Sequence, residues 1–289
     1  MISKKIVIGT ANFGMKYGLD KNKLYPDEIK KIFNYCKKER INSLDTAPGY
    51  KKSLENLKKN EIENWEIISK ISSLPLHVKD VNSYVKKVFF TTLKKLDLQK
   101  IHTILIHDEN DILNVSRGKK ITKALNDLKK ENLIKRVGSS IYDSYKIKKV
   151  INNYHFDVVQ CPYNIFDKRI VDSGLLNLLQ RKKTKIHIRS IFLQGLLLRN
   201  TKNVPSQFKK NIELKKYYDW LRINNLSSLR ICLTELSKIN FEKIVIGINN
   251  IKQLKEIVRF KKYSNKTTNI FKTNNLKLID PRKWKRTIY

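Results

Sequence analysis

The sequence predicts an α/β protein with a single-domain (β/α)8 TIM barrel, and three observations support this fold class. Eight short runs of β-branched and apolar residues recur along the chain, as is typical of parallel strands covered on both faces. Amphipathic helical patterns separate these runs. The length of 289 residues fits one barrel of about 250 residues with additions. Eight strands that alternate with helices therefore indicate a barrel.

The expected strands are short, and several are apolar almost throughout. They are Ile6–Gly9, Ser43–Thr46, Glu66–Ile71, Thr103–His107, Lys135–Ser139, Asp157–Cys161, Lys185–Ser190 and Lys243–Ile248. Between them, apolar residues recur at helical spacing with lysines on the opposite side, as in Val81, Val85 and Phe89 against Lys86 and Lys87. Each strand is thus followed by a helix that can cover it.

No linker rich in Pro, Gly or Ser interrupts this alternation, so one domain is expected over residues 1–289. Residues 200–220 are interpreted as an insertion before or within the seventh helix. The tail, residues 261–289, is polar and basic over most of its length. We expect this tail to fold across one end of the barrel.

The charge and the cysteine content limit which partners, disulfides and metal sites are expected. The chain carries 61 Lys and Arg against 26 Asp and Glu, a formal net charge of +35. Because the lysines are spread over nearly every predicted helix, we interpret them as solvated helix faces and expect no specific nucleic-acid partner. The three cysteines are scattered and lack C-x-x-C spacing, which argues against disulfides and structural zinc. No metal site is expected.

The apolar segments predict a cytoplasmic protein. No apolar run approaches the ~20 residues needed to span a bilayer. Near the N-terminus, only a three-residue apolar stretch precedes Gly9, whereas a signal peptide needs about 7–15 apolar residues.

Four ionisable residues stand where predicted strands run into the following loop. Asp45 ends the second strand and Tyr50 follows five residues later, while Lys70 and His107 close the third and fourth strands. Each residue also has a structural alternative. Asp45 could cap a turn, Tyr50 could be an ordinary tyrosine at the rim, Lys70 could extend its ammonium to solvent, and His107 could be a hydrogen-bonded core histidine. Ionisable groups in apolar strands are expensive to bury alone, so several on successive strands suggest a shared site.

Motifs around these residues resemble the aldo-keto reductase family from Gly9 to about Val258. The resemblance is closest to a bacterial branch found among sugar and cell-surface polysaccharide genes. The motifs are Gly9-Thr-Ala-Asn-Phe-Gly14, Asp45-Thr-Ala-Pro-Gly-Tyr50, Ile68-Ser-Lys70, Leu105-Ile-His107-Asp108, Val137-Gly-Ser-Ser140 with Tyr142-Asp143, Val158-Val-Gln160-Cys-Pro-Tyr163-Asn164, and Ile246-Gly247-Ile-Asn-Asn250 with Gln253 and Glu256.

Carbonyl reduction needs a proton on oxygen as well as a hydride on carbon. A phenol is a poor acid at its unperturbed pKa of about 10, so a neighbouring ammonium such as Lys70 is expected to lower the pKa of Tyr50. Asp45 would pair with Lys70 and hold it, and His107 would donate a hydrogen bond to the carbonyl oxygen. The resemblance implies the same catalytic roles.

A nicotinamide cofactor is expected across the barrel mouth, since no G-x-G-x-x-G follows a strand into a helix. NADP is preferred to NAD because Lys252 and Lys255 could meet a 2′-phosphate, although Gln253 stands where the family frequently has arginine. The expected cofactor-binding residues are Ser139, Ser140, Gln160, Ser190, Gly195, Gly247, Asn249, Asn250, Gln253 and Glu256.

The sequence thus predicts an NAD(P)H-dependent oxidoreductase that reduces an aldehyde or ketone to an alcohol, with a small-molecule carbonyl compound, for example a sugar-type carbonyl, as substrate. Two alternatives stay open: a barrel lyase or aldolase with Lys70 as Schiff base, and a non-catalytic basic binding protein on the same fold. Substrate specificity is expected in the βα loops, and Lys16, Tyr17 and Tyr163 are candidates for the mouth.

Overall fold

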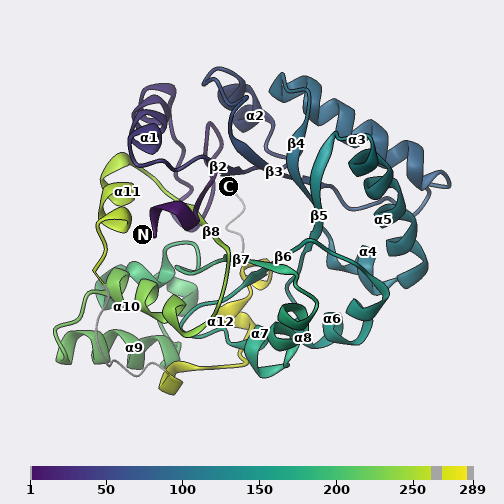
Figure 1. Cartoon of the computed structure of the whole chain (residues 1–289). Helices are drawn as coiled ribbons and strands as arrows, with labels where there is room; N and C mark the ends of the chain where they lie inside the picture. Colours follow the sequence, from purple (N-terminus) through teal and green to yellow (C-terminus); the bar gives the residue numbers. More distant parts are fainter. Residues whose placement is uncertain (1, 262–268, 285–289) are drawn as a thin grey trace.

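A computed structural model describes residues 2–261 and 269–284, and eight parallel strands in it close into a barrel (Figure 1). Each strand pairs with its sequence neighbours, and the ring closes between β1 and β8, where Ile6 lies opposite Ile244. The predicted barrel is therefore confirmed. The strands are β1 (Ile6–Gly9), β2 (Ser43–Asp45), β3 (Glu66–Ile71), β4 (Ile101–Ile106), β5 (Ile134–Ser140), β6 (Val158–Pro162), β7 (Lys185–Arg189) and β8 (Lys243–Gly247).

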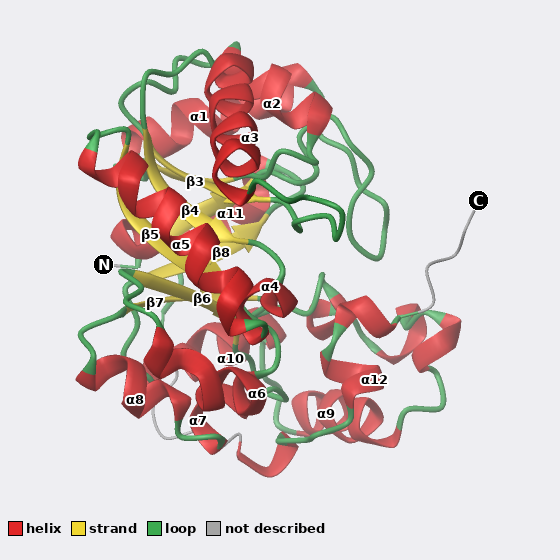
Figure 2. Cartoon of the chain, turned by 90° about the vertical axis from the view of Figure 1, so that its right-hand side faces the viewer, coloured by secondary structure: helices red, strands yellow, loops and turns green. Residues whose placement is uncertain are grey.

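Helices surround the barrel, and their apolar faces pack on the outward side chains of the strands in one large core (Figures 1 and 2). The predicted stripe of Val81, Val85 and Phe89 is buried in this core. The helices are α1 (Pro26–Lys38), α2 (Lys51–Lys58), α3 (Val81–Leu96), α4 (Glu109–Leu113), α5 (Val115–Lys130), α6 (Ser144–Val150), α7 (Arg169–Asp172), α8 (Leu175–Arg181), α9 (Ile212–Ile223), α10 (Ser228–Glu235), α11 (Ile251–Val258) and α12 (Leu276–Ile279).

The predicted insertion and the described part of the tail both reach the carboxyl end of the strands, where Asn200, Asn203 and Pro281 line the cavity. Residues 200–220 include short 3-10 turns and most of α9, so two helices rather than one separate β7 from β8. Figure 2 shows α9 and α12 on the side of the barrel away from the N-terminus. Trp284 packs edge-on against Phe208, with ring centroids 5.0 Å apart. Residues 262–268 and 285–289 of the predicted tail lie outside the described residues.

The interior of the barrel is layered, because every second residue of a strand points inward. A small apolar cluster of Val7, Ile68, Leu105 and Val158 fills the middle. Gly138 of β5 has no room for a side chain there, since an added Cβ would lie 2.0 Å from the carbonyl oxygen of Val158. This packed layer separates the two ends of the barrel, and polar residues occupy the inward positions at both.

Among the described residues, no helix is both long and apolar enough to cross a membrane.

Candidate active site

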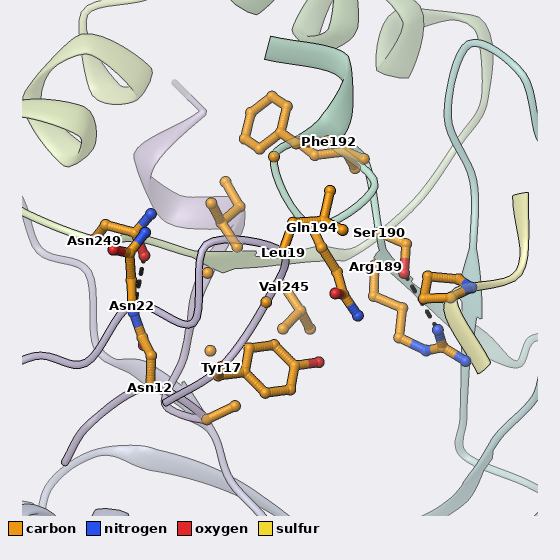
Figure 3. Close-up of a pocket in the computed structure, with 18 of the residues that line it drawn as sticks. Asn12, Tyr17, Leu19, Asn22, Arg189, Ser190, Phe192, Gln194, Val245 and Asn249 are labelled. Atoms are coloured by element: carbon orange, nitrogen blue, oxygen red, sulfur yellow. Dashed lines mark hydrogen bonds between the residues drawn. The ribbon is translucent and has the colours of Figure 1, made fainter. Parts of the chain in front are cut away.

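The layer above the apolar cluster takes one residue from the carboxyl end of each strand, and all eight line a single cavity of about 560 Å³. The loops after β1 and β7 wall this cavity (Figure 3). Polar groups from different strands thus converge on an open space, as enzyme sites do at this face of such barrels. The eight residues are Gly9, Asp45, Lys70, His107, Ser140, Gln160, Arg189 and Gly247.

Asp45 and Lys70 form a buried ion pair at the floor of the cavity. The Lys70 ammonium lies 2.6 Å from Asp45 Oδ1 and donates to the carbonyl oxygen of Thr46 at 2.8 Å. Gln160 donates its amide to the other carboxylate oxygen of Asp45 at 2.8 Å. Because both partners are almost fully buried, these contacts are needed to offset the cost of removing two charges from water. The expected contact between Asp45 and Lys70 is present.

Tyr50 caps the start of α2 and lines the same cavity, where its ring centroid lies 6.5 Å from that of Tyr17. Burial raises the pKa of Tyr50 well above its ordinary value, with Tyr17 and Asp45 adding to this effect and Arg189 opposing it. The direction is opposite to the expected lowering by Lys70, because burial of the phenol dominates and Asp45, which pairs with that ammonium, also raises the pKa of Tyr50. Tyr50 is therefore a protonated phenol at neutral pH.

His107 follows β4 directly and presents its ring to the cavity. Desolvation by the surrounding protein lowers the pKa of His107 to about 4, and the positive charge of Lys70 adds to this effect. The imidazole is therefore neutral at physiological pH and carries one N–H that can donate a hydrogen bond. A neutral donor of this kind suits a carbonyl oxygen.

Arg189 is a cavity residue that the sequence interpretation missed. Its guanidinium lies 3.8 Å from the ring centroid of Tyr142 and donates to the carbonyl oxygen of Ile141 at 2.8 Å. A second N–H donates to the Ser190 hydroxyl at 3.3 Å (Figure 3). Its position as the last residue of β7, equivalent to that of Ser140 in β5, is the signal that could have identified it.

Most of the predicted cofactor-binding residues reach the cavity, whereas three point elsewhere. Ser139 is one residue out of phase with Ser140, and its hydroxyl donates to the carbonyl oxygen of Ile106. Asn250 caps α11 by accepting a hydrogen bond from the backbone N–H of Gln253, and Glu256 is exposed farther along that helix. The residues that do line the cavity are Ser140, Gln160, Ser190, Gly195, Gly247, Asn249 and Gln253.

Tyr163, expected at the mouth, is instead buried. Its hydroxyl donates to Glu235 of α10 at 2.9 Å, in a cluster that also contains the ammonium of Lys168. Tyr17 does line the cavity, as expected, whereas Lys16 is not among the lining residues. Tyr163 therefore stabilises the contact between β6 and α10 rather than the mouth.

The loop after β7 has an unusual backbone that supports a binding role. Ser190, Leu193 and Gln194 have φ values of 61°, 45° and 53°, and Gly195 has a φ of 88°. Left-handed conformations at non-glycine residues cost free energy and concentrate at functional sites. This loop lines the cavity where a cofactor phosphate is expected.

The loop between β1 and α1 crosses toward this segment and narrows the cavity from above. Asp20 forms an ion pair with Arg199, and a Cβ added at Gly18 would lie 4.0 Å from the carbonyl oxygen of Gln194. Lower in the same wall, Asn12 donates to Asn249 at 3.1 Å (Figure 3). The loop after β1 and the loop after β7 thus contact each other at one wall of the cavity.

The far end of the cavity meets the start of α11. There, Glu28 of α1 accepts a hydrogen bond from the backbone N–H of Ile251 at 2.6 Å. Gln253 folds back to accept from the N–H of Asn249 at 2.8 Å. Lys255, expected near a phosphate, lies over the ring of Tyr35 at 5.7 Å. Among residues 2–261 and 269–284, no cluster of His, Cys, Asp and Glu could hold a metal ion.

Comparisons with known proteins agree with this geometry. The chain is 23% identical over 177 residues to an NADH-specific methylglyoxal reductase of Escherichia coli (strain K12), and the alignment covers 54% of each chain. Among solved structures, aldo-keto reductase AKR11C1 from Bacillus halodurans in its holo form superposes with a TM-score of 0.73 at 18% identity, covering 92% of this chain and 90% of that one.

A putative aldo-keto reductase from Pseudomonas aeruginosa superposes with a TM-score of 0.62 at 19% identity, covering 88% of this chain and 87% of the other. At these identities the structural likeness supports the fold alone. The model of the aldo/keto reductase family itself matches residues 5–273, which include every strand of the barrel and the whole cavity floor. The chain therefore belongs to the aldo/keto reductase family.

Proposed function

We propose that this protein reduces an aldehyde or ketone to an alcohol, with Tyr50 as the general acid. The observation that carries the proposal is a single cavity lined by the protonated phenol of Tyr50 together with a neutral imidazole and a compensated ion pair from the strand-end layer. A nicotinamide bound in this cavity would supply the hydride. Ser140 and Gln160 have the positions and hydrogen-bonding groups to hold its carboxamide.

The proton would come from the Tyr50 hydroxyl. A phenol whose pKa is raised remains protonated in the resting site, so its proton is available to the oxygen on which negative charge develops during hydride transfer. His107 would donate its N–H to the same substrate oxygen and stabilise negative charge there. Arg189, whose charge lowers the pKa of Tyr50, would stabilise the phenolate that remains. Lys70 and Asp45 would keep the floor rigid and electrically neutral.

Variants of two tyrosines test this role. Tyr50→Phe should lower kcat for methylglyoxal or a simple aldehyde by about 10²–10⁴-fold, because the proton donor is lost. The dissociation constant for NADH, followed by coenzyme fluorescence, should change less than about twofold. Tyr25→Phe is the matched control, since Tyr25 is 65% exposed outside the cavity. Failure of the wild-type protein to bind either coenzyme, or full turnover by Tyr50→Phe, would overturn the proposal.

For the coenzyme, we infer a preference for NADH over NADPH, in contrast to the expected NADP. The start of α11 is where the adenosine 2′-phosphate would approach, and helix N-termini ordinarily attract such anions. The Glu28 carboxylate already accepts the first N–H of this helix and would repel a second anion. The name of the E. coli relative, an NADH-specific enzyme, points the same way.

Charge removal at α1 tests the coenzyme preference. Glu28→Gln should shift the ratio of the NADPH and NADH dissociation constants toward NADPH by about tenfold, equivalent to ~1.4 kcal/mol. Asp27→Asn removes a charge from the adjacent, exposed position and should leave the ratio unchanged. If both variants shift the ratio equally, the cause is overall charge rather than the contact with Ile251.

The lyase alternative draws no support from the site. A Schiff-base lysine needs a free amine that a carbonyl carbon can reach. Lys70 is 3% exposed, and its ammonium contacts both Asp45 and the Thr46 carbonyl oxygen. Borohydride treatment with an aldehyde substrate should therefore leave Lys70 unmodified.

A further inference from the structure

The charges that line the cavity do not balance. Asp45 pairs with Lys70, and Asp20 pairs with Arg199. Tyr50 and His107 are neutral at physiological pH, as their pKa directions show. Arg189 is the remaining charged side chain of the lining, and within residues 2–261 and 269–284 it forms no ion pair with a carboxylate. The described cavity therefore carries one uncompensated positive charge.

The guanidinium of Arg189 is held firmly in place. Tyr142 lies against one of its faces at 3.8 Å, and Arg282 packs on the same aromatic ring at 3.6 Å. Arg282 is itself anchored by ion pairs to Asp280 and Glu109, which fixes the stack. A cation fixed in advance loses little conformational entropy when it binds a ligand.

Donors of Arg189 remain for a ligand. The contacts with the Ile141 carbonyl oxygen and the Ser190 hydroxyl use two of its five N–H groups. The side chain is half-buried, so its charge is only partly hydrated. A planar guanidinium matches the two oxygens of a carboxylate or phosphate, and three N–H groups of Arg189 remain for such a ligand.

The charge also acts at the reacting centre. Arg189 stands at the end of β7, in the same strand-end layer as Ser140 and Gln160. It lowers the pKa of both Tyr50 and His107, so the electrostatic reach of its guanidinium includes the groups that would hold the carbonyl oxygen. An anion bound to it would lie within the span of a small substrate.

We propose that Arg189 binds an anionic group of the substrate, so that the enzyme prefers carbonyl compounds that carry a carboxylate or phosphate a few bonds from the reacting carbon. This inference rests on the proposed reductase function and adds a substrate class to it. Tyr142 is a positioning residue that keeps the guanidinium aimed into the cavity.

Matched substrate pairs test the proposal. Reduction of succinic semialdehyde is compared with that of butanal, and reduction of glyceraldehyde 3-phosphate with that of glyceraldehyde, each with saturating NADH. The wild-type kcat/KM should favour at least one charged member by about tenfold or more, mainly through KM, as a charge-assisted bidentate contact provides. The two pairs distinguish a carboxylate from a phosphate.

Variants assign the preference to one residue. Arg189→Met should reduce the charged-to-neutral ratio about tenfold, whereas Arg189→Lys should retain part of it. Arg181→Met, on the exposed end of α8, is the control for net charge. As a measurement on the wild type alone, butyrate should inhibit butanal reduction competitively and more strongly than butyramide. That result keeps the proposal testable should Arg189→Met fail to fold.

Contrary outcomes are distinct. Equal kcat/KM for charged and neutral aldehydes in the wild type overturns the anion site but leaves the reductase function intact. Weaker NADH binding by Arg189→Met with an unchanged substrate ratio means that the cation serves the coenzyme phosphate instead. If none of the four aldehydes is reduced with NADH or NADPH, the proposed function itself fails.

Discussion

Both ends of this barrel contain charged residues at inward strand positions, but they use them differently. At the amino end, Lys243 contacts Glu66 at 3.1 Å, and Arg136 contacts Glu242 at 2.7 Å. Each of these charges has an opposite partner, and the groups close the barrel. At the carboxyl end, Arg189 has none among the described residues, and the layer opens into a cavity.

This difference separates a layer that closes the barrel from the layer that we propose as the active site. Charges at strand ends do not by themselves indicate a site, since the amino end has as many. What distinguishes the carboxyl end is an open volume, a neutral donor pair in Tyr50 and His107, and an incomplete balance of charge. An unpaired cation that is half-buried is costly for stability, and such costs are typical of binding sites.

The largest expected difference between the two ends comes from replacing one lysine at each end with an uncharged residue. Lys70→Met should remove most activity and destabilise the fold by about 3–5 kcal/mol, because Asp45 stays buried without its partner. Lys243→Met should cost about 1 kcal/mol, because Glu66 is partly solvated and keeps its bond to Ser43. Urea unfolding and kcat measure both. Equal losses of activity would mean that the two ends are functionally linked.

At the amino end, the ion pairs of Glu242 predict how the stability of the fold depends on pH. Burial alone would raise the pKa of Glu242, but contacts with His187 and Arg136 lower it to about 2. The charged form therefore stabilises the fold above pH ~4.5, and this contribution is lost as the pH falls toward 2. Glu242→Gln should cost about 1 kcal/mol at pH 7 after allowance for solvent screening, and progressively less at lower pH.

The control for this measurement is Glu63→Gln, at an exposed position outside the ion-pair layer. Urea unfolding at pH 7 and at about pH 4 gives the comparison. A Glu242→Gln penalty that grows on acidification would contradict the direction of the pKa shift. Turnover at pH 7 should be nearly unchanged, since Glu242 lies beneath the apolar layer.

The smallest expected effect is the change of kcat/KM with pH, which depends on two groups at the carboxyl end. The pKa of His107 is about 4 and that of Tyr50 is raised, so neither group changes protonation between about pH 6 and 9. For carbonyl reduction, kcat/KM should therefore vary less than about threefold over this range. Alcohol oxidation should instead accelerate with pH, because it needs the phenolate. If kcat/KM for carbonyl reduction instead changes with a midpoint near pH 6.5, and this change is absent in His107→Gln, the imidazole is charged below that pH and the expected neutral form is wrong.

The fold was largely predictable because strand and helix periods are local properties of the chain. Asp45, Lys70 and His107 stood out for the same reason, as ionisable residues in apolar strands. Arg189 did not, since one more basic residue is inconspicuous among 61 Lys and Arg. Its importance depends on the absence of a nearby carboxylate among the described residues, which only the folded arrangement reveals.

Other errors have equally specific causes. The sequence interpretation includes both Ser139 and Ser140 in the site. Because neighbouring residues of a strand point to opposite faces, only Ser140 faces the cavity. The sequence predicts a lowered pKa for Tyr50, but the pKa is raised because the folded chain buries the phenol and pairs Lys70 with Asp45, and neither effect can be read from the sequence. Glu28 meets Ile251 only through the packing of α1 beside α11, a contact between distant parts of the chain.

The most direct test of the whole account is a crystal structure of the protein with NADH. We expect the nicotinamide ring above the strand-end layer, its carboxamide on Ser140 and Gln160 and its reactive carbon facing Tyr50 and His107. The adenosine should extend toward Asn249. A dinucleotide bound outside the cavity, or a nicotinamide remote from Tyr50, would contradict the assignment of this layer as the catalytic site.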